Sequence, residues 1–460
     1  MIQHFINRKT ELNFLKDKYS EKGSQLIVLY GKRRVGKTEL IKKFIDMNGG
    51  TYILCTRDSL DENIKEMKRK FYNITKKEYF LKLTTNSLFD LFKYLIEEIK
   101  NRREIIVLDE FPYLIELHKG IVSVFQKIWD ELLKDKNVFI ILSGSSIGMM
   151  ETEILGYKSP LYGRRTGEWK LEPFKFKHIK GFFKKYSIED LIKTWCVCGG
   201  TPFYLSLLNP NVSIEKNIKE KILKKGEVLY NEPKVLLKEE FREPKTYTLI
   251  LKYLSLGYNS QGKLCSATGI EKGNLSKYLS VLEETHIVRH ILPLGQRKRG
   301  IYVINDPFFN FWFRFVYPNM SDLEMGLVND VYSRISSQLD TYFGHLFEEL
   351  IFEQIKQKII HFGLNLTEVR KWWHKDKEID IVALNEKTKE ILFVECKWKD
   401  NVNAEKIMKN LIEKSNYVKW NNNERKDYYA IFAKSFRKKI NEFEGKKVYC
   451  FDLKDLEKFL

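Results

Sequence analysis

Uninterrupted apolar runs occupy residues 26–30, 105–108 and 138–142 of this chain. A strand with one face in water alternates apolar and polar residues, whereas a strand buried on both faces is apolar throughout. The three runs therefore predict central strands of a parallel sheet. Residues 51–55 are a further candidate strand, and residues 61–100 carry the apolar stripe of amphipathic helices.

A change to helical spacing follows at about residue 171. Helices at 247–254 and 264–270, another that opens at Gly273, and a candidate wing at 289–302 predict a winged-helix domain. The outer face of the last helix and the wing would present Lys272, Asn274, Ser276, Lys277, Ser280, Arg297, Lys298 and Arg299. An aromatic segment at 306–318 is better explained as a buried hinge than as a base-stacking surface, because aromatic rings bury large areas.

The glycine-rich loop after the first apolar run comprises Gly31, Lys32, Arg33, Arg34, Val35, Gly36, Lys37 and Thr38. It has the pattern G-x-x-x-x-G-K-T of a P-loop. Its glycines allow the backbone N–H groups to surround a phosphate at the positive end of the next helix. We expect Lys37 to reach the β- and γ-phosphates and Thr38 to bind Mg²⁺.

Two acids, Asp109 and Glu110, follow the second apolar run. At the carboxyl end of a parallel strand they would lie beside the phosphate site. We expect Asp109 to hold Mg²⁺, directly or through water, and Glu110 to orient or deprotonate the attacking water.

Small polar residues follow the third apolar run. We choose Ser145 as the residue that contacts the γ-phosphate or the catalytic water, with Ser143 as the alternative. Arg164 and Arg165 come next, and an arginine there can stabilise transferring phosphate charge. We choose Arg164 for that role, although a basic turn explains the pair equally well.

These motifs resemble the archaeal ATPase family of P-loop proteins, within the AAA+ and signal-transduction ATPase groups. The matching pieces are residues 5–12, the P-loop, 108–110, 142–146, 162–164 and 199–205. The resemblance implies ATP rather than GTP, and it implies that Pro202, in a Gly-x-Pro element of the lid, meets the adenine base. The Ser145 position resembles the sensor of AAA+ ATPases.

A second candidate site lies near the C-terminus. An amphipathic helix at 344–351 carries Glu348, and two apolar strands carry Asp380, Glu395 and Lys397. Because side chains alternate along a strand, Glu395 and Lys397 share a face. The set resembles the D…E-x-K core of restriction-endonuclease-like nucleases. That resemblance implies that Asp380, Glu395 and Glu348 bind a metal ion, while Lys397 orients or activates water.

The composition adds a net charge of +19, which favours a polyanionic partner such as DNA, although a lysine-rich proteome would give the same charge. Six scattered cysteines indicate a reducing compartment. No apolar run approaches the length of about 18 residues that indicates a membrane span. We therefore expect a cytoplasmic protein without a membrane partner.

The sequence thus predicts an α/β protein in four parts. They are a P-loop ATPase core with an AAA+-like parallel sheet (1–170), a helical lid (171–235), a winged helix with the aromatic hinge (236–318), and a small nuclease-like α/β domain (319–460). The function expected is a slow Mg²⁺-dependent ATPase that acts on DNA or is regulated by it, with a metal-dependent nuclease domain. Two alternatives stay open: a nucleotide-controlled switch or scaffold with protein partners or self-association, and an ATP-dependent transcriptional regulator.

Overall fold

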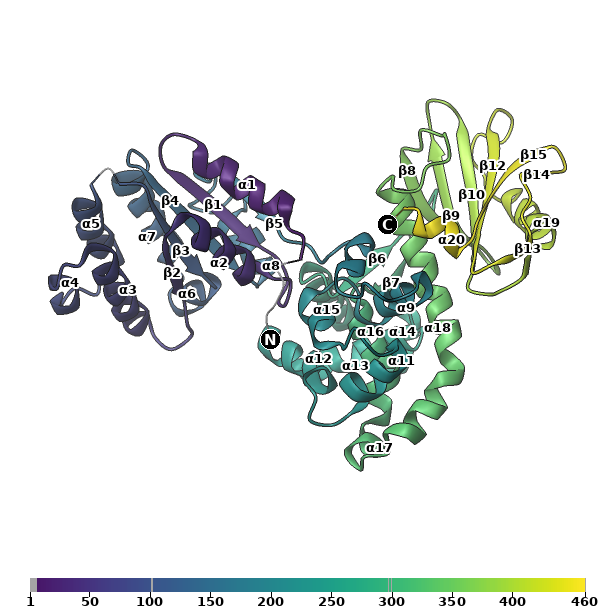
Figure 1. Ribbon diagram of the computed structural model, residues 1–460, viewed down its shortest axis with the longest axis horizontal. Coiled ribbons are helices and arrows are strands. Elements are labelled where there is room, and N and C mark those ends of the chain that lie inside the picture. Colours follow the sequence, from purple (N-terminus) through teal and green to yellow (C-terminus); the bar gives the residue numbers. More distant parts are fainter. Residues whose placement is uncertain (1–5, 101, 297, 299, 460) are drawn as a thin grey trace. The chain divides into compact units, whose positions relative to one another are not determined.

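The computed structural model describes residues 6–100, 102–296, 298 and 300–459. The chain divides into two compact units (Figure 1). The N-terminal unit runs to Pro173 and also takes in Thr201–Phe203. The C-terminal unit comprises Phe174–Gly200 and Tyr204–Leu460. None of the helices in the described residues is long and apolar enough to cross a membrane.

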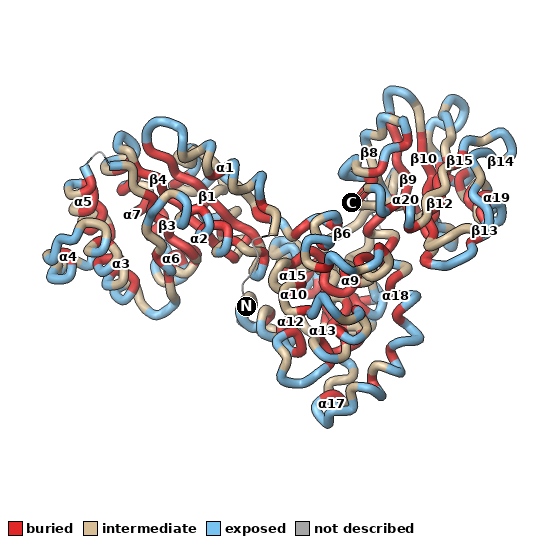
Figure 2. The backbone as a smooth tube through the Cα atoms, viewed as in Figure 1, coloured by how far each residue is buried: buried red, intermediate tan, exposed pale blue. Residues whose placement is uncertain are grey.

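The N-terminal unit is built on a parallel sheet with the strand order β2-β3-β4-β1-β5. The strands are β1 (Gln25–Tyr30), β2 (Thr51–Leu54), β3 (Glu104–Asp109), β4 (Val138–Gly144) and β5 (Gly167–Lys170). Every residue of β1 and β4 is buried, as expected for central strands (Figure 2). The edge strand β5 was not predicted, because its four residues, GEWK, carry no strand pattern of their own.

Helices cover both faces of this sheet. They are α1 (Lys9–Ser20), α2 (Lys37–Asn48), α3 (Leu60–Thr75), α4 (Tyr79–Lys82), α5 (Leu88–Ile99), α6 (Pro112–Leu117), α7 (Ile121–Ile128) and α8 (Ile147–Met149), with π-helical turns at Trp129–Leu133 and Met150–Ile154. Because side chains alternate along β1, Ile27 and Leu29 pack in one core with α1 and α2. Leu26 and Val28 pack on the opposite face with α3, α5 and α7.

The C-terminal unit begins with helices. They are a 3₁₀ turn (Phe176–Gly181), α9 (Ile188–Cys198), α10 (Pro202–Leu207), α11 (Ile214–Asn217), a π-helical turn (Ile218–Leu223), α12 (Val228–Glu240), α13 (Pro244–Ser255), α14 (Gln261–Thr268), α15 (Lys272–Glu284), α16 (Pro307–Phe311), a π-helical turn (Trp312–Val316), a 3₁₀ turn (Tyr317–Asn319), α17 (Met320–Glu324) and α18 (Val328–Lys356). The hairpin of β6 (Val288–Ile291) and β7 (Ile301–Ile304) follows α15. The aromatic segment is buried, and the Trp312 indole donates to the Tyr230 carbonyl at 2.8 Å.

The last part of this unit is a mixed sheet with the order β14-β15-β12-β10-β9-β8. The elements of this part are β8 (Glu368–His374), β9 (Lys377–Asn385), β10 (Glu390–Lys397), β11 (Val402–Asn403), α19 (Ala404–Ser415), β12 (Lys426–Ala433), β13 (Phe436–Lys438), β14 (Glu442–Phe443), β15 (Lys446–Phe451) and α20 (Leu453–Glu457). The strands β11 and β13 pair in a separate two-stranded sheet. Met408 and Leu411 of α19 pack in one core with Phe393 and Ile431 of the sheet. The prediction of an α/β protein is confirmed.

Candidate functional site

The P-loop connects β1 to α2 and passes close to the backbone at Leu171. A Cβ atom on Gly31 would lie 2.3 Å from the Leu171 carbonyl oxygen, so glycine is required there. Gly36 has a φ of 93° at the N-terminus of α2. Lys37 is buried, and its Nζ donates to the carbonyl oxygens of Gly31 at 2.8 Å and of Lys32 at 3.2 Å. The glycine backbone and the buried ammonium group fit a bound phosphate.

The variable positions of the loop contact the segment Thr201–Phe203. Lys32 Nζ donates to Thr201 Oγ1 at 2.7 Å, and the Arg34 guanidinium lies 4.4 Å from the centroid of the Phe203 ring. Pro202 lies between these partners, with its Cγ 3.9 Å from the place that a Cβ atom would take on the second loop glycine. The structure thus brings Pro202 beside the P-loop, while its contact with adenine stays a prediction.

The remaining loop positions are fixed by neighbours in the same unit. Val35 is buried, and its carbonyl oxygen accepts a hydrogen bond from Arg8 Nη2 at 2.9 Å. Arg33 Nη2 donates to the Tyr113 hydroxyl at 3.1 Å. These contacts hold the loop from the start of α1 and from α6.

The carboxylate of Asp109 lies at the end of β3 and is 1% exposed. Its Oδ2 accepts from Thr38 Oγ1 at 3.0 Å and from the Tyr52 hydroxyl at 2.6 Å. Its Oδ1 accepts from the Glu110 backbone N–H at 3.1 Å. Burial and the Asp109 charge raise the pKa of Tyr52, so this phenol stays a proton donor. Thr38 and Asp109 therefore meet, as a shared Mg²⁺ site requires.

Glu110 has a φ of 54°, in the left-handed region that side-chain-bearing residues rarely occupy. Its Oε2 accepts from both the backbone N–H of Ser145, at 3.1 Å, and the Ser145 hydroxyl, at 2.7 Å. Ser143 lies within β4 and is fully buried. The structure thus places Ser145, rather than Ser143, against the proposed water-activating acid. Strained backbone at such a position is typical of functional sites.

Arg164 is engaged by Asp130 of the first π-helical turn. Its Nε lies 2.9 Å from each Asp130 carboxylate oxygen, and its Nη2 lies 2.7 Å from Oδ2. Arg165 pairs with Glu168. In this structure both guanidinium groups bind carboxylates, so contact with a γ-phosphate requires Arg164 to leave Asp130. A role for Arg164 in phosphoryl transfer stays a prediction.

The second predicted cluster lies where β9 and β10 pair. The last antiparallel pair is Ile381 with Val394, which places Asp380 next to Glu395. Asp380 Oδ2 accepts from the backbone N–H of residue 396 at 2.7 Å. Glu395 is 6% exposed, and its Oε1 accepts from Lys397 Nζ at 2.6 Å. The structure therefore brings these predicted residues together.

Metal binding at these acids stays a prediction. Burial, followed by the charge of Asp380, raises the pKa of Glu348 to about 9. Lys414 of α19, which the sequence analysis did not single out, donates to both Glu395 oxygens at 3.2 Å. Among the residues that the structure describes, no group of three or more His, Cys, Asp or Glu side chains could hold a metal ion. Lys397 and Lys414 both pair with Glu395 in this structure.

The hairpin predicted as a DNA-binding wing is joined to the C-terminal domain. Arg289 of β6 and Lys371 of β8 both pair with Glu349 of α18, and the Lys371 distance is 2.5 Å. The Leu294 backbone N–H donates to the Lys371 carbonyl oxygen at 2.9 Å. Burial alone would raise the pKa of Glu349, but Lys371 and Arg289 lower it to about 2. The base of the wing is thus a contact within the unit.

Two further surfaces were predicted to contact DNA, namely the tip of the wing and the outer face of α15. Arg297 and Arg299 lie outside the described residues, whereas Lys298 is exposed. The outward positions predicted on α15 are all exposed, namely Lys272, Asn274, Ser276, Lys277 and Ser280. This helix face therefore remains available to a partner.

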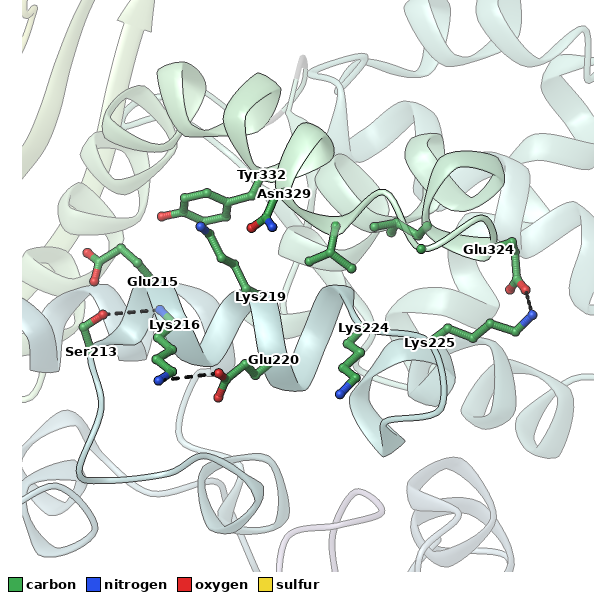
Figure 3. A pocket seen from close by; sticks show the side chains of 13 residues that line it. Ser213, Glu215, Lys216, Lys219, Glu220, Lys224, Lys225, Glu324, Asn329 and Tyr332 are labelled. Atoms are coloured by element: carbon green, nitrogen blue, oxygen red, sulfur yellow. Dashed lines mark hydrogen bonds and ion pairs between the residues drawn. The ribbon is translucent and has the colours of Figure 1, made fainter.

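A cavity of about 730 Å³ also lies in the C-terminal unit (Figure 3). It is lined by Ser213, Glu215, Lys216, Lys219, Glu220, Lys224, Lys225, Leu323, Glu324, Gly326, Val328, Asn329 and Tyr332. Lys225 pairs with Glu324 at 2.5 Å, and the Lys219 ammonium lies 4.5 Å from the centroid of the Tyr332 ring. Lys225 is thus paired with an acid, and Lys219 lies against an aromatic ring.

Comparison with known proteins identifies the family. A family described as an ATPase domain predominantly from Archaea matches residues 5–208, and one described as Archaea bacterial proteins of unknown function matches residues 312–407. Over 458 residues the chain is 34% identical to an uncharacterized protein of Methanocaldococcus jannaschii, covering 98% of this chain and 99% of the relative. The chain belongs to the archaeal ATPase family.

Other matches to this chain are shorter or more distant. An uncharacterized ATP-binding protein of M. jannaschii is 62% identical over 42 residues, which are 9% of this chain and 71% of that protein. The Walker-type ATPase of Pyrococcus abyssi is 24% identical, covers 67% of this chain and 96% of its own, and has a TM-score of 0.49. The Aeropyrum pernix ORC2 protein is 12% identical, covers 71% and 98%, and has a TM-score of 0.46. The family match at residues 5–208 is what assigns an ATPase domain of archaeal type to this chain.

Glu349, with Arg289 and Lys371, forms a cluster that we expect to stabilise the C-terminal unit. Glu349→Gln should lower the free energy of unfolding of the C-terminal unit by about 2 kcal/mol, because it leaves Lys371 and the partly exposed Arg289 without their carboxylate. Chemical unfolding monitored by fluorescence measures the change. The control is Glu413→Gln, whose exposed pair with Lys377 should leave the free energy of unfolding nearly unchanged. Equal effects of the two substitutions would contradict the importance of the Glu349 cluster.

Proposed function

We propose that this archaeal ATPase binds Mg²⁺·ATP and hydrolyses it slowly. The observation that carries the proposal is the convergence of Lys37, Thr38, Asp109 and Glu110 at the carboxyl ends of β1 and β3. Acidic, hydroxyl and ammonium groups in this arrangement match the parts that P-loop ATPases use.

Each of these residues has a distinct task in the proposal. Thr38 and Asp109 would hold Mg²⁺, which when bound neutralises charge on the phosphates. The Lys37 ammonium group donates to two loop carbonyl oxygens in this structure. In the proposal it would bind the β- and γ-phosphates instead. Glu110, held by Ser145, would orient the attacking water and accept its proton.

Two substitutions separate binding from turnover. Lys37→Ala should abolish ATP binding, because it removes the buried charge that meets the phosphates. Glu110→Gln should keep ATP binding and lower the turnover number by about 10²- to 10⁴-fold, because an amide cannot take a proton. Calorimetry and phosphate release measure the two quantities. Lys42→Ala, an exposed change on α2, is the control for charge removal. Turnover at the parent rate in Glu110→Gln would refute its role.

We further propose that the ATPase acts on DNA or is regulated by it through the exposed face of α15. The support is the net charge of +19 and the basic, polar composition of that face. The alternative is an ATP-dependent transcriptional regulator that acts through the winged helix alone.

The DNA proposal predicts a salt effect. Each phosphate contact contributes about −0.9 to the slope of log affinity against log salt concentration, so a Lys272→Ala/Lys277→Ala double variant should flatten that slope by about 1.8. Fluorescence anisotropy of labelled duplex DNA measures it. The control variant Lys406→Ala/Lys409→Ala removes the same charge from the exposed side of α19 and should keep the parent slope. If the two double variants behave alike, α15 is not the contact.

A second candidate function is phosphodiester cleavage by the C-terminal domain with a divalent metal. Its support is the proximity of Asp380, Glu395 and Lys397. Lys397 and Lys414 both donate hydrogen bonds to the Glu395 carboxylate in this structure, so no catalytic step is assigned to Glu395. The rival proposal is a switch or scaffold in which this domain binds other proteins.

A nicking assay distinguishes the two roles of the C-terminal domain. The parent protein should nick plasmid DNA with Mg²⁺ or Mn²⁺, and Asp380→Ala should stop nicking while ATP hydrolysis continues, because the ATP site lies in the other unit. Asp376→Ala, at an exposed position before β9, is the matched control. If the parent protein cuts no DNA in any nucleotide state, the switch or scaffold becomes the better proposal.

A further inference from the structure

We infer that Tyr52 is a positioning residue that fixes which oxygen of Asp109 faces the magnesium ion. The inference rests on the proposed Mg²⁺·ATP site and adds a residue that belongs to neither the P-loop nor the acidic strand end. Tyr52 comes from β2, and its hydroxyl makes the shortest of the hydrogen bonds to the Asp109 side chain given above, at 2.6 Å.

The register of the sheet explains how Tyr52 reaches Asp109. β2 and β3 are parallel, and Tyr52 lies opposite Val107. Residues two apart on a strand share a face, so Val107 and Asp109 point the same way. A tyrosine ring extends far enough along that face to bring its hydroxyl to the carboxylate. The neighbouring residues of β2 cannot replace it, because Thr51 and Ile53 both face the opposite side of the sheet.

A count of acceptor positions shows what this hydrogen bond does. Each oxygen of an ionised carboxylate has two acceptor positions. Within the part of the chain that the structure describes, Oδ2 of Asp109 accepts from Thr38 and Tyr52, so both of its positions are used. Oδ1 accepts from the Glu110 N–H and has one position left. Oδ1 is therefore the oxygen for a metal ion or for a water bound to it.

Thr38 can keep its part of this arrangement when Mg²⁺ is bound. A hydroxyl that binds a metal through a lone pair keeps its proton, so Thr38 Oγ1 can still donate its hydrogen bond to Asp109 Oδ2. Without the Tyr52 hydroxyl, Oδ2 would regain an open acceptor position inside a buried site, and the carboxylate would lose its orientation. Hydrogen-bond partners of metal ligands commonly matter in this way.

The test measures ADP affinity by calorimetry, once with excess Mg²⁺ and once with EDTA, in the full-length protein. Tyr52→Phe should leave the affinity in EDTA unchanged and reduce the gain in affinity from Mg²⁺ by about tenfold. Tyr79→Phe is the matched control, since its hydroxyl lies 3.3 Å from Glu98 in the same unit and belongs to α4. This control should keep the full gain from Mg²⁺.

Each outcome decides a different question. If the parent protein gains no ADP affinity from Mg²⁺, the proposed function fails and the role of Tyr52 fails with it. If the parent gains affinity and Tyr52→Phe gains as much, the inference about Tyr52 is overturned while the proposed function stands. A Tyr52→Phe protein that loses affinity equally in EDTA, or that melts well below the Tyr79→Phe control, would show that the hydroxyl supports the fold instead.

Discussion

The parallel register of β1, β3 and β4 is the constraint on which the nucleotide site depends. Tyr30, the last residue of β1, lies beside Gly144, the last residue of β4, and Leu108 lies beside Leu142. The segments that follow these strands therefore begin at one edge of the sheet. The P-loop, Asp109 with Glu110, and Ser145 meet there because the three strands end together. A one-residue slip of β3 would turn Asp109 to the opposite face, since side chains alternate along a strand.

Hydrogen bonds at this edge then orient groups that the strands only bring near one another. Asp109 is fixed by donors from α2, from β2 and from its own neighbour in sequence. Glu110 is fixed by Ser145, the residue that directly follows β4. A buried carboxylate with several donors has little freedom, and such preorganisation is what electrostatic catalysis requires.

In the C-terminal unit, ion pairs join segments that are distant in the sequence. The buried acids of this unit would be unstable alone, and the fold supplies cations from distant segments. Glu349 takes one cation from the hairpin and one from β8, while Glu395 takes Lys397 and Lys414. The hairpin, α18 and the mixed sheet are consequently tied together. The hairpin thus supports the mixed sheet, and α15 keeps an exposed face.

Local sequence determined much of this protein. Consecutive apolar residues gave the central strands, because a doubly buried strand needs them, and the P-loop pattern carries its own backbone chemistry. The four-residue strand β5 escaped prediction, because its placement depends on pairing with β1. Tertiary structure also decided that Tyr52 faces Asp109, that Arg164 binds Asp130 and that Lys414 reaches Glu395. These contacts join residues 57, 34 and 19 positions apart. No periodicity in one segment encodes such a partner, since the partner is set by strand order and helix packing.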